Sequence, residues 1–278
     1  MAALLERRRA AITEWNWTVI GGNLGLGLAI VALVLLAVGP FGWRLGWWHY
    51  SFAFFWLLPT AGFAALAAVL VSSITLAFGW SHTGGRGLAV AAIGVALGAV
   101  VAYVPWHYDR VRKSVPPIHD ITTDTDNPPA FVAALKLRPP GSNTVSYEGP
   151  AVAGKQRAAY PDIAPVKVGL PPAEGFKRAL DAARAMPGWT VVDADPATGR
   201  IEANETSRWF HFTDDVVIRI TAEGVGSRID VRSESRLGRS DFGVNADRIR
   251  AYTAALTAAP AERKANRAEN LPRFLLRS

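Results

Sequence analysis

The chain has 278 residues, of which half are apolar and 19% are charged, and its formal net charge is +7. The excess positive charge lies within residues 1–113 and in the tail, because the stretch 114–260 has 17 basic and 18 acidic residues. Composition therefore argues against a nucleic-acid-binding face on the folded part, and the absence of cysteine excludes disulfides and thiol sites.

A short basic segment, residues 1–17, opens the chain with Arg7, Arg8 and Arg9. Three stretches without Lys, Arg, Asp or Glu follow, at 15–43, 45–85 and 87–106. Each reaches the roughly 20 residues that a helix needs to cross about 30 Å of hydrocarbon, and the first exceeds the length of a signal-peptide core. Trp residues near the ends suit a membrane interface. The sequence predicts three transmembrane helices, near 18–40, 52–78 and 87–106.

The orientation of these helices rests on the basic residues that flank them. With the N-terminus inside, four basic residues lie on each side, so the positive-inside count is tied. The first helix usually dominates, and its cluster Arg7–Arg9 favours an internal N-terminus. We therefore expect a multi-pass membrane protein whose C-terminal domain lies outside the cytoplasm.

Pairs of glycines four residues apart occur in the first and third predicted helices, as Gly21/Gly25 and Gly94/Gly98. Such pairs let helix backbones approach closely. They can pack the three helices into one bundle, or join copies of the chain into a homo-oligomer.

Residues 107–163 are rich in proline and poor in periodic apolar residues, which predicts an extended, mostly irregular connector. Its stretch "IHDITTDTDN" gathers His119, Asp120, Asp124 and Asp126, which are possible oxygen and nitrogen ligands for a cation. The glycine and distal glutamate of a calcium loop are missing. A solvated, turn-forming segment is the alternative. No cofactor is predicted.

Residues 164–260 have the pattern of a compact α+β domain, followed by a basic C-terminal tail at 261–278. The predicted elements are a strand at 164–170, a helix after Pro171, strands at 189–195, 199–210, 214–222 and 227–237, and a helix at 245–259. Strands joined by short turns pair antiparallel. The order β-α-β-β-β-β-α predicts a two-layer domain, an antiparallel sheet with both helices on its apolar face.

The opposite face of this sheet carries alternating acidic and basic side chains, and we expect it to be open to water or a ligand. Arg219 and Arg232 project from it, and Arg236 and Arg239 follow the last strand, near Asp241 and Asn245. These six residues are candidates for binding a partner or an anionic group. Cross-strand ion pairs are the alternative interpretation.

His211, Asp215 and Asp241 are weak candidates for acid–base catalysis, since a histidine near carboxylates can transfer protons. The alternatives are structural. His211 near a turn is expected to be solvated, and Asp241 and Asn245 suit the N-terminus of the last helix, with Phe242 anchoring the loop.

The stretches "IHDITTDTDNPPAF", "RAAYPDIAPV" and "GRIEANETSRWFHFTDDVVIRI…GSRIDVRSESRLGRSDFGVNADRIRAY" resemble the bacterial family catalogued as domain of unknown function 1499, over roughly 117–257. The resemblance implies an envelope-associated or membrane protein, and it implies no established activity or catalytic residue. With the predicted topology, it leads us to expect a multi-pass protein of the bacterial inner (plasma) membrane with a periplasmic C-terminal domain.

The leading functional hypothesis is a non-enzymatic membrane-anchored protein whose C-terminal domain binds a partner protein, a lipid headgroup or a small ligand. The alternatives are a structural subunit of a larger membrane complex, and an enzyme that acts on an envelope or lipid-derived substrate.

Overall fold

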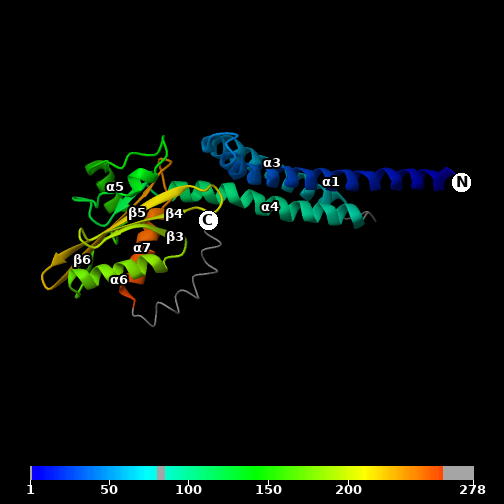
Figure 1. The fold of residues 1–278 in the computed structure, drawn as a ribbon. Coiled ribbons are helices and arrows are strands. Elements are labelled where there is room, and N and C mark those ends of the chain that lie inside the picture. Colours follow the sequence, from blue (N-terminus) through cyan, green and yellow to red (C-terminus); the bar gives the residue numbers. More distant parts are fainter. Residues whose placement is uncertain (1, 80–84, 259–278) are drawn as a thin grey trace. The chain divides into compact units, whose positions relative to one another are not determined.

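The computed structural model describes residues 2–79 and 85–258, and the predicted basic tail 261–278 lies outside this part of the chain. The chain divides into two compact units between Val111 and Arg112. The first unit consists of helices, and the second, here called the C-terminal domain, contains the sheet (Figure 1). Each unit is described by itself.

The first unit contains α1 (Ala2–Arg44), α2 (Tyr50–Phe52), a π-helix η1 (Ala53–Leu57), α3 (Leu58–Gly79) and most of α4 (Gly85–Ser114). Three spans within it are long and apolar enough to cross a membrane: Trp17–Arg44, Tyr50–Gly79 and Gly85–Ser114. They contain the three predicted spans. Large side chains such as Phe63 and Phe78 are more than 70% exposed on these helices, as lipid-facing residues would be.

The paired glycines lie where these helices contact each other. A Cβ atom added at Gly25 or Gly94 would meet the hydroxyl of Ser72 on α3, and one at Gly98 would lie 3.0 Å from the carbonyl oxygen of Ala65. Gly21 likewise faces Thr75. All four glycines therefore serve contacts within one chain, whereas a contact between copies through them stays a prediction.

The C-terminal domain is built on a six-stranded antiparallel sheet, which confirms the predicted fold class. Its strands are β1 (Asp120–Thr122), β2 (Val166–Val168), β3 (Trp189–Asp195), β4 (Arg200–Thr206), β5 (Thr213–Glu223) and β6 (Gly226–Ser235). The order is β1-β6-β5-β4-β3, and β2 also pairs with β6. Five strands match predicted ones, although β4 and β6 end before the predicted 210 and 237. β1 was not predicted.

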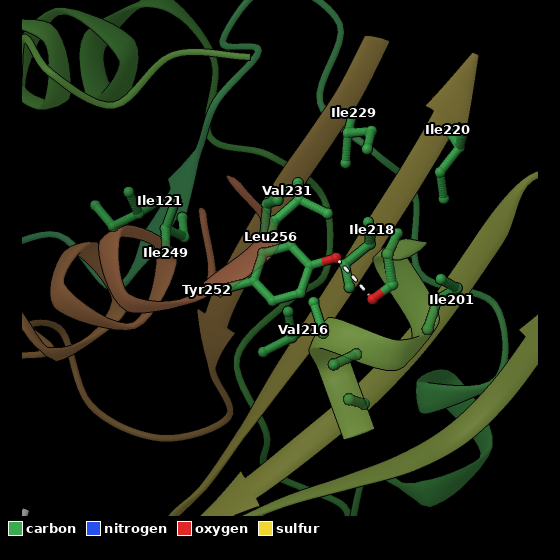
Figure 2. Close-up of a cluster of buried hydrophobic side chains, with 14 of the residues drawn as sticks. Ile121, Ile201, Val216, Ile218, Ile220, Ile229, Val231, Ile249, Tyr252 and Leu256 are labelled. Carbon is green, nitrogen blue, oxygen red and sulfur yellow. Dashed lines mark hydrogen bonds between the residues drawn. The ribbon is translucent and has the colours of Figure 1, made fainter. Parts of the chain in front are cut away.

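Helices α6 (Pro172–Ala185) and α7 (Val244–Thr257) lie on one face of the sheet, as predicted (Figure 1). Between them and the sheet is the main apolar core, to which each of β4, β5 and β6 contributes alternate residues (Figure 2). Tyr252 of α7 is fully buried there, donates a hydrogen bond of 3.0 Å to the carbonyl oxygen of Ala179 on α6, and stacks on Trp189.

The polar face of the sheet is not open, which corrects the prediction from the sequence. Residues 123–148, here called the covering segment, lie across it. Phe131 and Ala134 pack on Val217, and Glu202 accepts hydrogen bonds from three successive backbone N–H groups, of residues 132–134. Because these N–H groups begin the 3-10 helix η2 (Ala134–Leu137), the carboxylate stabilises its N-terminus.

The expectation of an irregular connector at 107–163 is therefore also wrong in part. This stretch contains the end of α4, then β1, η2 and α5 (Pro150–Ala159). α5 is fixed to the sheet by Gln156, whose side-chain amide exchanges hydrogen bonds of 3.0 and 2.6 Å with the backbone of Thr122. Prolines break up the periodicity of this stretch without preventing it from folding.

Candidate functional site

Three carboxylates form one row beneath the covering segment. Antiparallel register places Asp120 of β1 opposite Glu234 of β6, and Glu234 opposite Asp215 of β5. All three are at most 3% exposed. Burying three negative charges side by side is unfavourable unless cations compensate them.

Three arginines supply that compensation. Arg232 donates two hydrogen bonds to Asp120, of 2.9 and 2.8 Å, and Arg236 donates two to Asp215, of 2.9 and 2.6 Å. Arg138, from the covering segment, lies 3.0 Å from Asp215 and 3.2 Å from Glu234. The row of six side chains is therefore formally neutral, and the ion-pair interpretation of Arg232 and Arg236 describes their contacts.

Burial, together with the neighbouring charge of Asp120, raises the pKa of Glu234 to about 7, against the lowering effect of Arg138 and Arg232. Glu234 has the weakest compensation in the row, since Arg138 also serves Asp215 and Arg232 lies 3.7 Å away. This carboxyl group consequently changes its protonation state near neutral pH.

A second ionic cluster fixes the start of the covering segment. Arg219 and Arg228 both contact Asp124 and Asp230, at 2.9 to 3.1 Å. Arg219, a candidate for ligand binding, thus has two carboxylate partners within the chain, and Asp124, a candidate metal ligand, has two guanidinium partners.

The candidate metal ligands do not come together. Asp120 is paired with Arg232 and Asp124 with Arg219, while Asp126 lies 3.7 Å from Arg157. His119 is 3.9 Å from Glu148, and its desolvation lowers its pKa. In residues 2–79 and 85–258, no cluster of three or more His, Asp or Glu has the arrangement of a metal site.

The acid–base candidates are also held apart. His211 is exposed on the loop between β4 and β5, Asp215 is buried beneath Arg236, and Asp241 is buried at the start of α7. Within the described residues, no hydrogen bond or ion pair links any two of them.

Asp241 instead organises the loop between β6 and α7, residues 236–243, here called the signature loop. Its two carboxylate oxygens accept hydrogen bonds from the backbone N–H groups of Gly243 (2.9 Å) and Asn245 (3.0 Å). Phe242 and Gly243 both adopt positive φ, of 55° and 84°. The prediction that Asp241 or Asn245 is the N-cap is wrong, because Gly243 takes that position, but Asp241 does bind the backbone where α7 begins. Burial raises the pKa of Asp241 to about 6.

Asn245 and Arg248 of α7 add further polar contacts between this helix and the sheet. Asn245 donates to the carbonyl oxygen of His119 and accepts from Ser233, and Arg248 pairs with Glu205 (2.7 Å) and Asp214 (2.8 Å). Sequence reasoning missed Arg248 and Arg138. The helical position of Arg248 opposite the strand carboxylates was a usable signal, but nothing local distinguished Arg138.

Residues 120–256 match the family model described as "Protein of unknown function (DUF1499)". This domain belongs to that family. The match confirms the resemblance and extends from β1 almost to the end of α7, so the DUF1499 domain includes the covering segment as well as the sheet. Neither the curated proteins nor the solved structures include a significant match to the chain.

Two neighbouring loops of the DUF1499 domain expose charged and aromatic side chains. The first is the β4–β5 loop, residues 207–212, here called the aromatic loop, and the second is the signature loop. They are adjacent because Arg236 N–H donates to the carbonyl oxygen of Thr213, where β5 begins and β6 has just ended. The exposed charges of these two loops include Arg208 and Arg239, whereas Arg236 and Asp241 are buried.

Trp209 lies at the turn of the aromatic loop and is 48% exposed. The guanidinium of Arg208 lies 5.8 Å from its ring centre, within the range of a cation–π contact. An exposed indole beside exposed guanidinium groups can bind an anion and cover an apolar surface at the same place.

Proposed function

We propose that this protein is a multi-pass protein of the bacterial inner membrane whose periplasmic DUF1499 domain is a non-catalytic binding module for an anionic group. The aromatic and signature loops form the binding surface. The observation that carries the proposal is the exposure of Arg208 and Arg239 on adjacent loops, while Arg219, Arg232 and Arg236 are occupied by carboxylates of the chain itself.

Only a guanidinium group that is not already paired within the chain can bind an external anion at little cost. A guanidinium paired with a buried carboxylate has little to offer an external anion, because binding would have to break that pair and leave a buried charge uncompensated. An exposed arginine has no such cost. The phosphate of a lipid, the carboxylates of a protein and an anionic small molecule share the chemistry that these arginines recognise.

Site-specific photocrosslinking in native membranes tests this proposal. A photoreactive phenylalanine analogue replaces Leu237, which is partly exposed on the signature loop, so that Arg208 and Arg239 are both kept. The matched control carries the analogue at Val225, which is 97% exposed on the β5–β6 turn. We expect an adduct at position 237 that weakens when Arg208→Gln is added, and little adduct at position 225. Equal yields at both positions, or indifference to Arg208→Gln, would contradict the binding surface.

The orientation is tested separately with reporter fusions after Ser278. A reporter that is active only in the periplasm is expected because the Arg7–Arg9 cluster favours a cytoplasmic N-terminus. Reporter activity only in the cytoplasm would contradict the proposed topology. The DUF1499 domain would then lie in the cytoplasm, and its anionic ligand would have to be a cytoplasmic one.

A further inference from the structure

The chain enters the sheet of the DUF1499 domain at one particular end. α4 ends at Ser114, and β1 begins at Asp120, opposite Glu234 near the end of β6. β6 ends and β5 begins at this same end, so the aromatic and signature loops lie there too. Five residues, 115–119, connect α4 to β1 and span at most about 18 Å when fully extended.

The signature loop holds this connection directly. The backbone N–H of Asp241 donates to the carbonyl oxygen of Ile118 (3.0 Å), and the side-chain amide of Asn245 donates to that of His119 (2.9 Å). The N–H of Ser235 also donates to His119 (2.9 Å). The connection from α4 and the loop that carries Arg239 are therefore parts of one hydrogen-bonded unit.

The aromatic loop is closed by its own hydrogen bonds. The N–H of Ser207 donates to the carbonyl oxygen of Phe212 (2.8 Å), and the N–H of Phe212 donates to the Ser207 hydroxyl (2.9 Å). Phe210 and Phe212 stack with ring centres 5.1 Å apart, and His211 turns the chain with φ of 53°. Trp209 is therefore presented on a preformed turn, which reduces the entropy lost on binding.

The side chains exposed at this end suit a bilayer surface. Trp is favoured at the boundary between lipid and water, and exposed Arg is attracted by anionic headgroups. Leu137, 48% exposed, adds apolar surface beside Arg236, whose guanidinium donates to its carbonyl oxygen (2.9 Å). The opposite end, at the β5–β6 turn, carries the acidic Glu223 and the aliphatic Val225.

We infer that the aromatic loop of the DUF1499 domain inserts Trp209 into the interface of the bilayer that the three apolar helices are suited to cross, while Arg208 and Arg239 bind anionic lipid headgroups. The inference rests on the proposed function and names the anionic group as lipid phosphate. The loops and the apolar helices belong to one chain, so a lipid contact at the loops forms within the molecule and at a raised effective concentration.

Single-site fluorescence labelling tests this inference, and it is clean because the chain has no cysteine. The full chain is reconstituted in lipid nanodiscs after Trp209→Cys or Val225→Cys, each labelled with an environment-sensitive fluorophore. The nanodiscs contain either phosphatidylcholine alone or phosphatidylcholine with phosphatidylglycerol. Accessibility to a neutral aqueous quencher is measured in low and high salt.

We expect the label at position 209 to be several-fold less accessible to the quencher in anionic nanodiscs than the label at position 225. High salt should weaken this protection because it screens the arginines. Arg208→Gln combined with Arg239→Gln should shift the docking equilibrium about 30-fold toward the undocked state, as expected for two near-surface basic residues. Circular dichroism of each variant confirms that exposed substitutions leave the fold intact.

Equal quencher access at positions 209 and 225 would overturn the lipid inference. If the crosslinked adduct at position 237 persists in that case, the proposed function stands with a protein or a soluble anion as its ligand. If the adduct is missing, the proposed function fails as well. Protection at position 209 that ignores both lipid charge and the two arginine substitutions would overturn the assignment of headgroup phosphate as the ligand.

Discussion

The two faces of the sheet are both buried, but different forces hold their covers in place. On one face, α6 and α7 pack against Ile201, Ile218 and Val231 in the main apolar core, and polar contacts of Asn245 and Arg248 lie at its edge. On the other, the covering segment is held mainly by Arg138, Arg232 and Glu202 through ion pairs and hydrogen bonds to backbone groups. The adjacent residues Val217 and Ile218 face these two environments from one strand.

The burial of a region does not by itself predict how much stability a substitution there removes. Apolar packing loses stability in proportion to the atoms removed, whereas an ionic cover depends on each charge keeping its partner. The predictions below use this difference. Each is measured as the free energy of unfolding of the C-terminal domain, by pulse proteolysis in urea of the full chain in detergent.

Arg138→Met should have the largest effect, a loss of about 3–5 kcal/mol, because it leaves Glu234 and Asp215 buried with less compensation. Adding Glu234→Met should restore most of the loss, since the pair is then replaced by apolar side chains of similar volume. A single substitution that costs less than about 1 kcal/mol would show that the covering segment does not depend on its ion pairs.

Ile218→Ala tests the apolar face. A fully buried isoleucine replaced by alanine typically costs about 2–5 kcal/mol. This loss should be the same at pH 5 and pH 8, because Ile218 lies in the apolar core, where burial raises the pKa of Tyr252 further above this range. A loss that varies strongly with pH would mean that the two faces are not energetically separate.

Glu234→Gln should produce a smaller effect that depends on pH. The pKa of Glu234 is raised from 4.5 to about 7 in the folded protein, so between these values the folded state binds more protons than the unfolded state. Stability from this group is therefore present below pH 4.5 and lost as pH rises through about 7. The difference in unfolding free energy between wild type and variant should shift against the wild type across this window.

Asp241, whose pKa is raised to about 6, titrates in the same range, which is why the variant is compared with the wild type at each pH. Asp120, Asp215, Arg138 and Arg232 face Glu234, and the pKa of His119 nearby is lowered. A difference that does not change between pH 4.5 and pH 8 would contradict the raised pKa of Glu234.

Lys167→Ala should have the smallest effect, below about 1 kcal/mol. Lys167 forms an ion pair of 2.8 Å with Glu223, but its side chain is 72% exposed, so water and salt screen the interaction. The loss of stability at this exposed ion pair is the reference for the losses at the buried ion pairs. A loss comparable to that of Arg138→Met would remove the distinction on which the comparison depends.

The apolar face could be predicted from the sequence because its signal is local. Alternating residues such as Ile218 and Ile220 define strands, and the periodicity of Phe176, Leu180 and Ala183 defines α6. The cover of the other face could not be predicted, because its contacts are distant: Asp120 and Arg232 are separated by 112 positions. A strand of three residues has too few positions to show a period.

The candidate site followed the same division. The structural role of Asp241 was predictable from helix-capping chemistry over a few residues. The partners of Arg219, Arg232 and Arg236 were not, since alternating charges on a strand are compatible with both an open recognition face and a buried ionic one. Trp209 became a candidate only when the strand register placed its loop beside Arg239.

Because β1 pairs with the end of β6, this part of the sheet can form only late in synthesis of the chain. β1 follows α4 at once, yet Asp120 cannot meet Arg232 until 112 further residues have been added. At about 5–20 residues per second, this takes roughly 6–22 s. During that interval Asp120 has no Arg232 with which to pair. We therefore expect the pairing of β1 with β6 to be among the last steps of folding.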